Sequence, residues 1–287
     1  MSRLSHKWVV AAGLLAPLLA AGQTLSGPES VEFHPRLGRS LISSTDNGTI
    51  VARAEDGTLS LFTAAPSAPY GIELLAGTLF VLDSGRIKGY DIDSAMEVMN
   101  LALSGASFLN GISSNGVDTL YVSDFSAKTI RSIDVSNLAV PVPATPISTG
   151  SSVPNGVVYD RIGNRLLIAT WGSNAKILAL DLVPGATPVP LINTTLANID
   201  GITLDCRGAI IVAAWSGCTS GGCLRRFDPP FTLGSPAQSI VDGLSAPADI
   251  DFDPASARIG VPQSGNDTVS LHASTCESAL FYGDFER

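Results

Sequence analysis

The sequence is poor in charged and aromatic residues. Asp, Glu, Lys and Arg make up 15 % of its 287 residues, and Phe, Trp and Tyr make up 6 %. Hydrophobic residues reach 45 %, and the chain holds 28 Gly and 18 Pro. Little charge combined with much apolar surface argues against a disordered chain. Beyond residue 22 no long run has a helical period, so a helical bundle is also disfavoured.

Basic residues are scarcer than acidic ones. The chain has 17 Lys and Arg against 26 Asp and Glu, which gives a net charge of −9. A negative surface repels phosphates and anionic lipids, so we expect neither nucleic acid nor a membrane surface as a partner. The same negative field is compatible with holding a cation, although solubility alone also explains it.

The N-terminus, residues 1–22, is predicted to be a signal peptide. Arg3 and Lys7 precede an apolar run over 8–21, and small residues at 20–22 suit cleavage. The run is short for a membrane span, although a retained anchor helix is the alternative. Cleavage would remove two basic residues and no acid, which takes the net charge from −9 to −11. We expect an exported protein, periplasmic or secreted, with no membrane contact after cleavage.

Four cysteines in an exported chain favour disulfide bonds. Cys218 and Cys223 are separated by Thr-Ser-Gly-Gly, a flexible turn between two strand-like runs, so we predict that these two pair. Cys206 would then pair with Cys276. A zinc site is the alternative, but the spacing is not Cys-x2-Cys and no His lies near in sequence.

Six repeated units fill the rest of the chain. Their starts share a pattern of one apolar or Pro residue, a variable residue, a small residue and then Ile or Val, and they lie 40 to 48 residues apart. This period is typical of a four-stranded propeller blade. We therefore predict an all-β, six-bladed β-propeller over residues 23–275. Residues 276–287 form either a C-terminal tail or the closing strand.

Short runs of Val, Ile, Leu and Tyr within each unit predict strands separated by turns. The second strand is predicted at 79–83, 120–124, 166–170 and 210–214, and the third, which ends in Asp, at 87–91, 130–134 and 177–181. A Pro-rich segment at 141–146 is predicted to lengthen the connection between the third and fourth units. No helical pattern separates the strands, which disfavours a parallel α/β sheet.

The variable residue at each start defines a column through the repeats. Because the innermost strands of a propeller line its channel, equivalent residues of successive blades should form a ring. The column consists of Glu29, Tyr70, Asn110, Asn155, Asp200 and Ala248.

Oxygen donors dominate this column, and oxygen is the ligand that hard divalent cations prefer. We expect Ca²⁺, with Mg²⁺, Mn²⁺ or Zn²⁺ as alternatives. Asn and Asp before Gly are also common in turns, so a plain turn role is the competing interpretation. Turn chemistry does not select Glu29, although the nearby Glu32 competes with it for the role of ligand.

The motifs Gly-Pro-Glu29-Ser-Val, Leu-Asn110-Gly, Pro-Asn155-Gly and Ile-Asp200-Gly resemble the channel-lining motifs of the SMP-30/gluconolactonase/regucalcin propellers. The resemblance covers the repeats of the whole chain after residue 22. It implies Glu29, Asn155 and Asp200 as metal ligands and Asp200 also as the base. It implies Asn110 as a further catalytic residue that contacts the metal or the substrate. Members of this family hydrolyse lactones with a bound divalent metal.

One position departs from that family. An Arg that often holds substrate two residues before the Asn is replaced here by Phe108. This favours a less anionic substrate than a sugar-acid lactone. Tyr70, Trp171 and Trp215 are candidate substrate contacts, although a role as buried packing residues is the favoured interpretation of the two Trp residues.

The resulting hypothesis is a monomeric metal-dependent hydrolase that acts on a small lactone or ester. The metal would polarise the carbonyl group, and Asp200 would take a proton from water. The alternatives are a strictosidine-synthase-like or paraoxonase-like propeller enzyme, and a non-enzymatic binding propeller with a structural cation.

Overall fold

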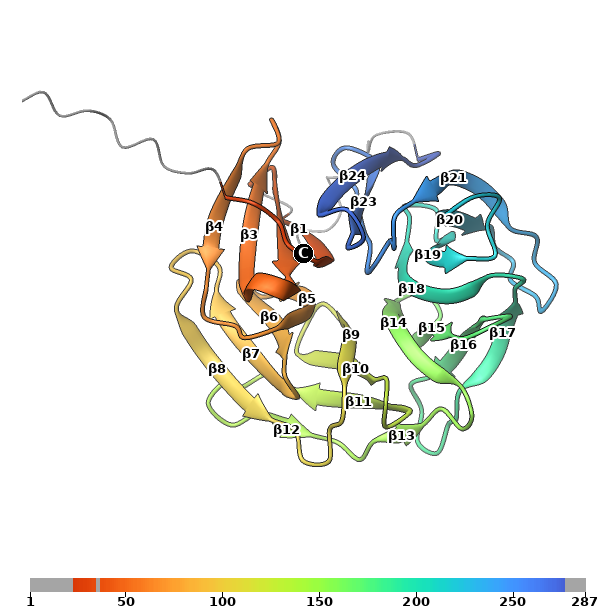
Figure 1. Cartoon of the computed structure of the whole chain (residues 1–287). Helices are drawn as coiled ribbons and strands as arrows, with labels where there is room; N and C mark the ends of the chain where they lie inside the picture. The colour runs from red at the N-terminus through yellow and green to blue at the C-terminus, as the bar shows by residue number, and fades with distance from the viewer. Residues whose placement is uncertain (1–22, 35–36, 277–287) are drawn as a thin grey trace, which may run out of the picture.

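Short antiparallel strands separated by turns and loops run through the whole of the described chain. The computed structural model describes residues 23–34 and 37–276. Six small sheets surround a central axis, and blade 1 lies beside blade 6 (Figure 1). The predicted all-β, six-bladed propeller is confirmed. The predicted signal peptide at 1–22 and residues 277–287 lie outside the described residues.

Each blade is built from strands that are consecutive in sequence, with the first strand innermost. Blade 1 holds β1 (Pro28–His34), β2 (Arg39–Ser44), β3 (Thr49–Ala54) and β4 (Leu59–Thr63), with the short 3-10 helix η1 (Thr45–Asn47) after β2, and blade 2 holds β5 (Pro69–Leu75), β6 (Thr78–Asp83), β7 (Arg86–Asp91) and β8 (Glu97–Ala102). Blade 3 holds β9 (Leu109–Ser114), β10 (Thr119–Asp124), β11 (Thr129–Asp134), β12 (Val142–Pro143) and β13 (Ile147–Ser148), and blade 4 holds β14 (Val153–Asp160), β15 (Arg165–Trp171), β16 (Lys176–Asp181) and β17 (Val189–Asn193). Blade 5 holds β18 (Ala197–Leu204), β19 (Ile210–Ser216), β20 (Gly222–Phe227) and β21 (Gln238–Leu244), and blade 6 holds β22 (Asp251–Asp253), β23 (Arg258–Gln263) and β24 (Thr268–Ala273).

The predicted strands agree with these bounds to within a few residues, but the segment at 141–146 differs from the prediction. Instead of only lengthening a connection, it contributes β12, and both β12 and β13 pair with β11. The outer strand of blade 3 is therefore split into two short pieces. Proline cannot donate to a ladder, so Pro141, Pro143 and Pro146 confine pairing to short stretches at the sheet edge.

The inner strands bulge where they reach the channel. Pairing registers shift at the column residue in β1, β5, β14 and β18. Such a bulge redirects a side chain. The Gly that follows permits close approach of the next blade: a Cβ at Gly111 would lie 2.5 Å from the Asn155 carbonyl oxygen, and a Cβ at Gly156 would lie 2.5 Å from that of Asp200. The Asn-Gly and Asp-Gly pairs thus belong to strands and not to turns.

Apolar clusters fill five of the six blade interfaces, from blades 1 and 2 through to blades 5 and 6. Among the described residues no such cluster joins blade 6 to blade 1. There the ring is closed by polar contacts: the Asp249 amide donates to the Glu29 carbonyl at 2.8 Å, and the Ser30 hydroxyl donates to the Asp249 carboxylate at 3.0 Å.

Both predicted disulfides are present. Cys218 pairs with Cys223 within blade 5, and Cys206 pairs with Cys276 across 70 residues. The second bond ties the chain after β24 to the β18–β19 turn. Two disulfides are compatible with an oxidising compartment. Within the described part of the chain, no helix has the length and apolar character needed to cross a membrane.

Candidate functional site

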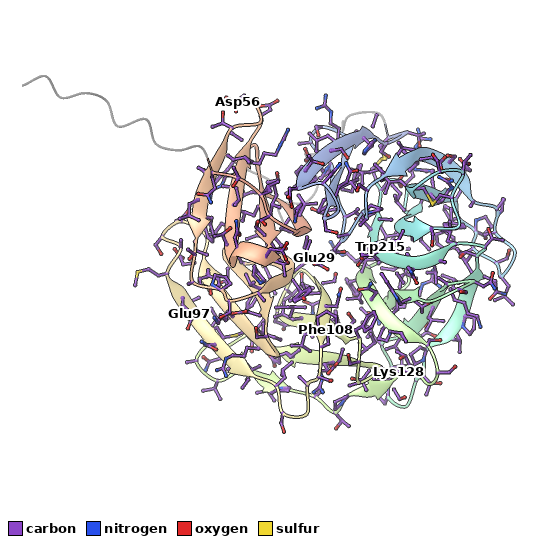
Figure 2. All side chains as sticks on the ribbon, in the orientation of Figure 1. Glu29, Asp56, Glu97, Phe108, Lys128 and Trp215 are labelled. Carbon is purple, nitrogen blue, oxygen red and sulfur yellow. A yellow bond between two sulfur atoms is a disulfide. The ribbon has the colours of Figure 1, made fainter. Side chains whose placement is uncertain are left out.

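The column predicted from the repeats converges on a single cavity. This cavity, of about 420 Å³, is called the site cavity below. Its lining includes Glu29, Tyr70, Asn110, Asn155, Asp200 and Ala248, one residue from each blade. Figure 2 shows Glu29 and Trp215 close to the centre of the ring.

The four carboxylate and carboxamide side chains of this column are buried. Asn155 is 1 % exposed and Asp200 is 5 % exposed, and Glu29 and Asn110 are also buried. The Asn155 Nδ2 donates a hydrogen bond of 3.0 Å to Asp200 Oδ1. Because the amide nitrogen is committed to Asp200, the oxygen of Asn155 remains available for another partner.

Three buried oxygen atoms of the site cavity have no hydrogen-bond partner among the described residues. They are Glu29 Oε2, Asn110 Oδ1 and Asn155 Oδ1, from blades 1, 3 and 4. Leaving one such group unpaired costs about 1–3 kcal/mol. Three such oxygen atoms at one cavity indicate a binding site for a hydrogen-bond donor or a cation. A set of oxygens with two nearby carboxylates fits Ca²⁺ or a similar hard cation.

Two carboxyl groups of the site cavity, those of Glu29 and Asp200, have a raised pKa. Burial, reinforced by the charges of Asp200 and Asp249, raises the pKa of Glu29 well above its ordinary value. Burial raises the pKa of Asp200 to about 7, against the opposing effect of hydrogen bonds from Trp215 and Asn155. A bound cation would favour the charged forms of both groups.

Glu32, the competing candidate ligand, lies elsewhere. It lines a separate, smaller cavity further along β1, together with Glu73, Asp249 and Asp251. Burial is the largest cause of a raised pKa at each of these four carboxyl groups. The structure therefore groups Glu29, not Glu32, with Asn155 and Asp200.

Aromatic side chains cover one side of the site cavity. Tyr70, Trp171 and Trp215 line it, as do Phe108 and Phe125. Trp215 is 38 % exposed, so it is not a buried packing residue. Phe125 was missed from the sequence, although a signal was present: it directly follows β10, at the position that Trp171 and Trp215 occupy in blades 4 and 5.

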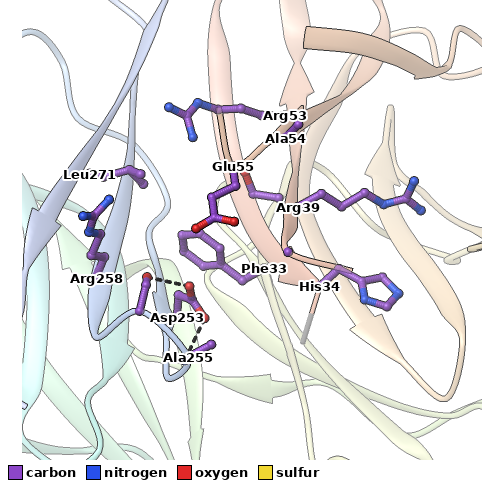
Figure 3. Close-up of a pocket in the computed structure, with 13 residues that line it drawn as sticks. Phe33, His34, Arg39, Arg53, Ala54, Glu55, Asp253, Ala255, Arg258 and Leu271 are labelled. Atoms are coloured by element: carbon purple, nitrogen blue, oxygen red, sulfur yellow. Dashed lines mark hydrogen bonds between the residues drawn. The ribbon is translucent and has the colours of Figure 1, made fainter. Parts of the chain in front are cut away.

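A second cavity, of about 270 Å³, lies at the seam between blades 1 and 6 and contains none of the predicted site residues. Arg39, Arg53 and Arg258 line it, together with Glu55 and Asp253. Figure 3 shows the Arg39 guanidinium pointing away from those of Arg53 and Arg258, so the three do not converge on one anion.

No protein-family model and no curated protein matches this chain. Solved structures share its fold. A gluconolactonase from Xanthomonas campestris aligns with a TM-score of 0.68 at 14 % identity, covering 88 % of this chain and 87 % of that one. A luciferin-regenerating enzyme gives a TM-score of 0.65 at 13 % identity, with coverage of 89 % and 93 %. A Bacteroides thetaiotaomicron protein of unknown function gives 0.68 at 11 %, with coverage of 87 % and 70 %. At these identities the likeness shows the propeller fold alone.

Proposed function

We propose that this protein is a metal-dependent hydrolase that opens a lactone or related ester in its channel. The observation that carries this proposal is the set of three unpartnered oxygens, from Glu29, Asn110 and Asn155, that face one cavity beside Asp200. The structures of a gluconolactonase and of a luciferin-regenerating enzyme, which share the fold, support a hydrolase.

Glu29, Asn155 and Asp200 would hold the cation through side-chain oxygens, and Asn110 would contact the cation or the substrate. When bound, a divalent cation supplies positive charge that polarises an ester carbonyl and stabilises the oxyanion. Calcium is the first choice because every candidate ligand atom is oxygen. Mg²⁺, Mn²⁺ and Zn²⁺ are the alternatives.

Asp200 would serve as the base. Its carboxyl group lines the site cavity, where a carboxylate can take a proton from water and return it. As water attacks the carbonyl carbon, its proton passes to Asp200. When the acyl C–O bond breaks, Asp200 returns that proton to the leaving oxygen. Asn155 keeps Asp200 in place through the hydrogen bond to Oδ1.

Lactone turnover with added Ca²⁺ tests this proposal. Asp200→Ala and Asn155→Ala should lose at least about 100-fold in kcat/KM, since each removes an oxygen from the site. Glu29→Gln should also lose turnover, whereas the matched variant Glu32→Gln should retain it. Undiminished turnover in Asp200→Ala and Asn155→Ala would refute the assignment.

A protein that binds a cation yet hydrolyses none of a broad panel of lactones and aryl esters would instead be a binding propeller with a structural ion. We also propose export to the periplasm or the medium, which the two disulfides support.

A further inference from the structure

The lining of the site cavity changes character from one side to the other. Blades 2 to 5 contribute a continuous aromatic arc, which consists of Tyr70, Phe108, Phe125, Trp171 and Trp215. Blades 1 and 6 contribute polar residues instead, namely Thr45, Asp46 and Ser264. The cavity therefore offers one apolar face and one polar face to whatever enters it.

The sequence repeats explain this division. One residue at the end of the second strand, or directly after it, occupies an equivalent place in each blade. In blades 3 to 5 that residue is aromatic, and in blades 6, 1 and 2 it carries a small hydroxyl group. In blade order the set is Thr45, Ser84, Phe125, Trp171, Trp215 and Ser264.

The aromatic arc is formed before any ligand arrives. Neighbouring rings meet edge to face, with centroid distances of 4.8 Å for Tyr70–Phe108, 5.6 Å for Phe108–Phe125, 5.9 Å for Phe125–Trp171 and 5.1 Å for Trp171–Trp215. Because each ring is braced by its neighbours, little side-chain freedom remains to be lost on binding. Such a surface suits a flat, apolar group.

The acidic side chains that line the site cavity disfavour anionic ligands. Its charged side chains are Glu29, Asp46 and Asp200, and no Lys or Arg is among the described residues that line it. A carboxylate or phosphate on the substrate would have no basic partner to pair with. An uncharged substrate meets no such penalty.

We propose that the substrate is an uncharged lactone or ester whose non-reacting part is an aromatic ring, held against the aromatic arc. This inference rests on the proposed function, because it places the ester group at the oxygens of Asn110, Asn155 and Asp200. The arc fixes the ring and leaves the carbonyl beside Asn110, Asn155 and Asp200.

Two lactones with the same six-membered ester ring test the proposal. Dihydrocoumarin carries a fused benzene ring, and δ-valerolactone does not. Phe125→Ser and Trp171→Leu should raise KM for dihydrocoumarin about tenfold and change KM for δ-valerolactone less than twofold, with kcat little changed. Ser84→Ala, at the equivalent position of blade 2 but outside the cavity lining, should change neither. Each variant is compared with the wild type on the same lactone, so the different leaving groups of the two lactones do not affect the comparison.

Equal effects on both lactones would overturn the inference while leaving the proposed hydrolase intact. If neither lactone is hydrolysed, a measurement of dihydrocoumarin binding tests the inference instead. Trp171 and Trp215 are the only tryptophans after residue 22, so their fluorescence reports a ring bound to the arc. Dihydrocoumarin should change it saturably in chelator-treated protein, and Phe125→Ser should weaken that binding at least fivefold. The absence of a saturable change would overturn the inference.

Discussion

Single glycines allow the inner strands to approach closely enough to form the ring of column residues. A Cβ on Gly156 would lie 2.5 Å from the Asp200 carbonyl oxygen and 3.0 Å from the Ile202 amide nitrogen. Both atoms belong to the backbone of β18, so neither can move aside as a flexible side chain would. The glycine at this place is therefore a packing requirement between blades 4 and 5.

Gly156→Ala should destabilise the protein by about 2 kcal/mol or more, because the new methyl group pushes two backbones apart. The matched control is Gly234→Ala, where nothing lies within 4 Å of an added Cβ and the backbone conformation is ordinary. That change should be neutral or slightly stabilising. Urea denaturation of both variants gives the comparison, and equal midpoints would contradict this account of Gly156.

At this scale the sequence predicted the column and missed much of the cavity wall. The repeats alone placed Glu29, Asn155 and Asp200 in one register, and the structure brings them to one cavity. Periodicity could not show that the Asn-Gly pairs lie within strands, because turns and bulges use the same residues. Phe125 shares its repeat position with Trp171 and Trp215, so the sequence could have placed it in the wall. Phe108 has no aromatic counterpart at its position in the other repeats.

Among the six blades, blade 6 has the smallest described sheet. It has three described strands, whereas the other blades have four or more, and no apolar cluster joins it to blade 1 within the described ranges. The Cys206–Cys276 disulfide joins the end of this blade to blade 5. Cys276 also packs with Phe252 and Ile259 in the cluster between these two blades. The disulfide thus restrains the last element of the ring.

Removing the two disulfides should have unequal effects. A cross-link constrains the unfolded chain more when it closes a longer loop. Its loss should cost about 4 kcal/mol for Cys206→Ser with Cys276→Ser, and about 2 kcal/mol for Cys218→Ser with Cys223→Ser. The sequence separations behind this difference are 70 and 5 residues.

Hydrogen exchange shows which strands lose stability when the disulfide is removed, and by how much. The double variant at Cys206 and Cys276 should speed exchange in β22–β24 more than in β14–β17 of blade 4. A uniform rise over all blades, or a larger stability loss from the short-range pair, would argue against the proposed restraint of blade 6.

Over the whole molecule, the channel concentrates carboxyl groups that burial keeps from ionising. Glu73 has its pKa raised to about 8, chiefly by burial, while its Oε1 accepts a hydrogen bond of 2.6 Å from the Ser114 hydroxyl. Because the folded pKa exceeds the ordinary 4.5, the folded state holds this proton more tightly than the unfolded state. The resulting stability is complete below pH 4.5 and is lost as the pH rises to about 8.

Glu73→Gln should remove this contribution. Between pH 5 and pH 8, in chelator-treated protein, the free energy of unfolding should fall less in the variant than in the wild type, by on the order of 2 kcal/mol. Urea titrations at the two pH values measure the difference. A wild type whose stability rises over this range, or a variant with the same slope, would contradict the raised pKa.

The repeat length and the strand chemistry sufficed to predict the whole ring, because a propeller is a sum of similar units. They did not predict how the ring closes. That depends on polar contacts of Glu29 and Ser30 in the first unit with Asp249 in the last unit. The shared start pattern does not show that these residues hydrogen-bond. The split outer strand of blade 3 was likewise set by where prolines interrupt its pairing.

The central claim is that oxygens from separate blades jointly hold one divalent cation. Calorimetric titration of the chelator-treated protein with CaCl₂ tests it most directly. The account predicts one Ca²⁺ per chain, with affinity at least about tenfold weaker in Glu29→Gln, which replaces a charged ligand, and unchanged in Glu32→Gln. No binding of Ca²⁺, Mg²⁺, Mn²⁺ or Zn²⁺ by the wild type, or equal affinity in Glu29→Gln, would contradict it.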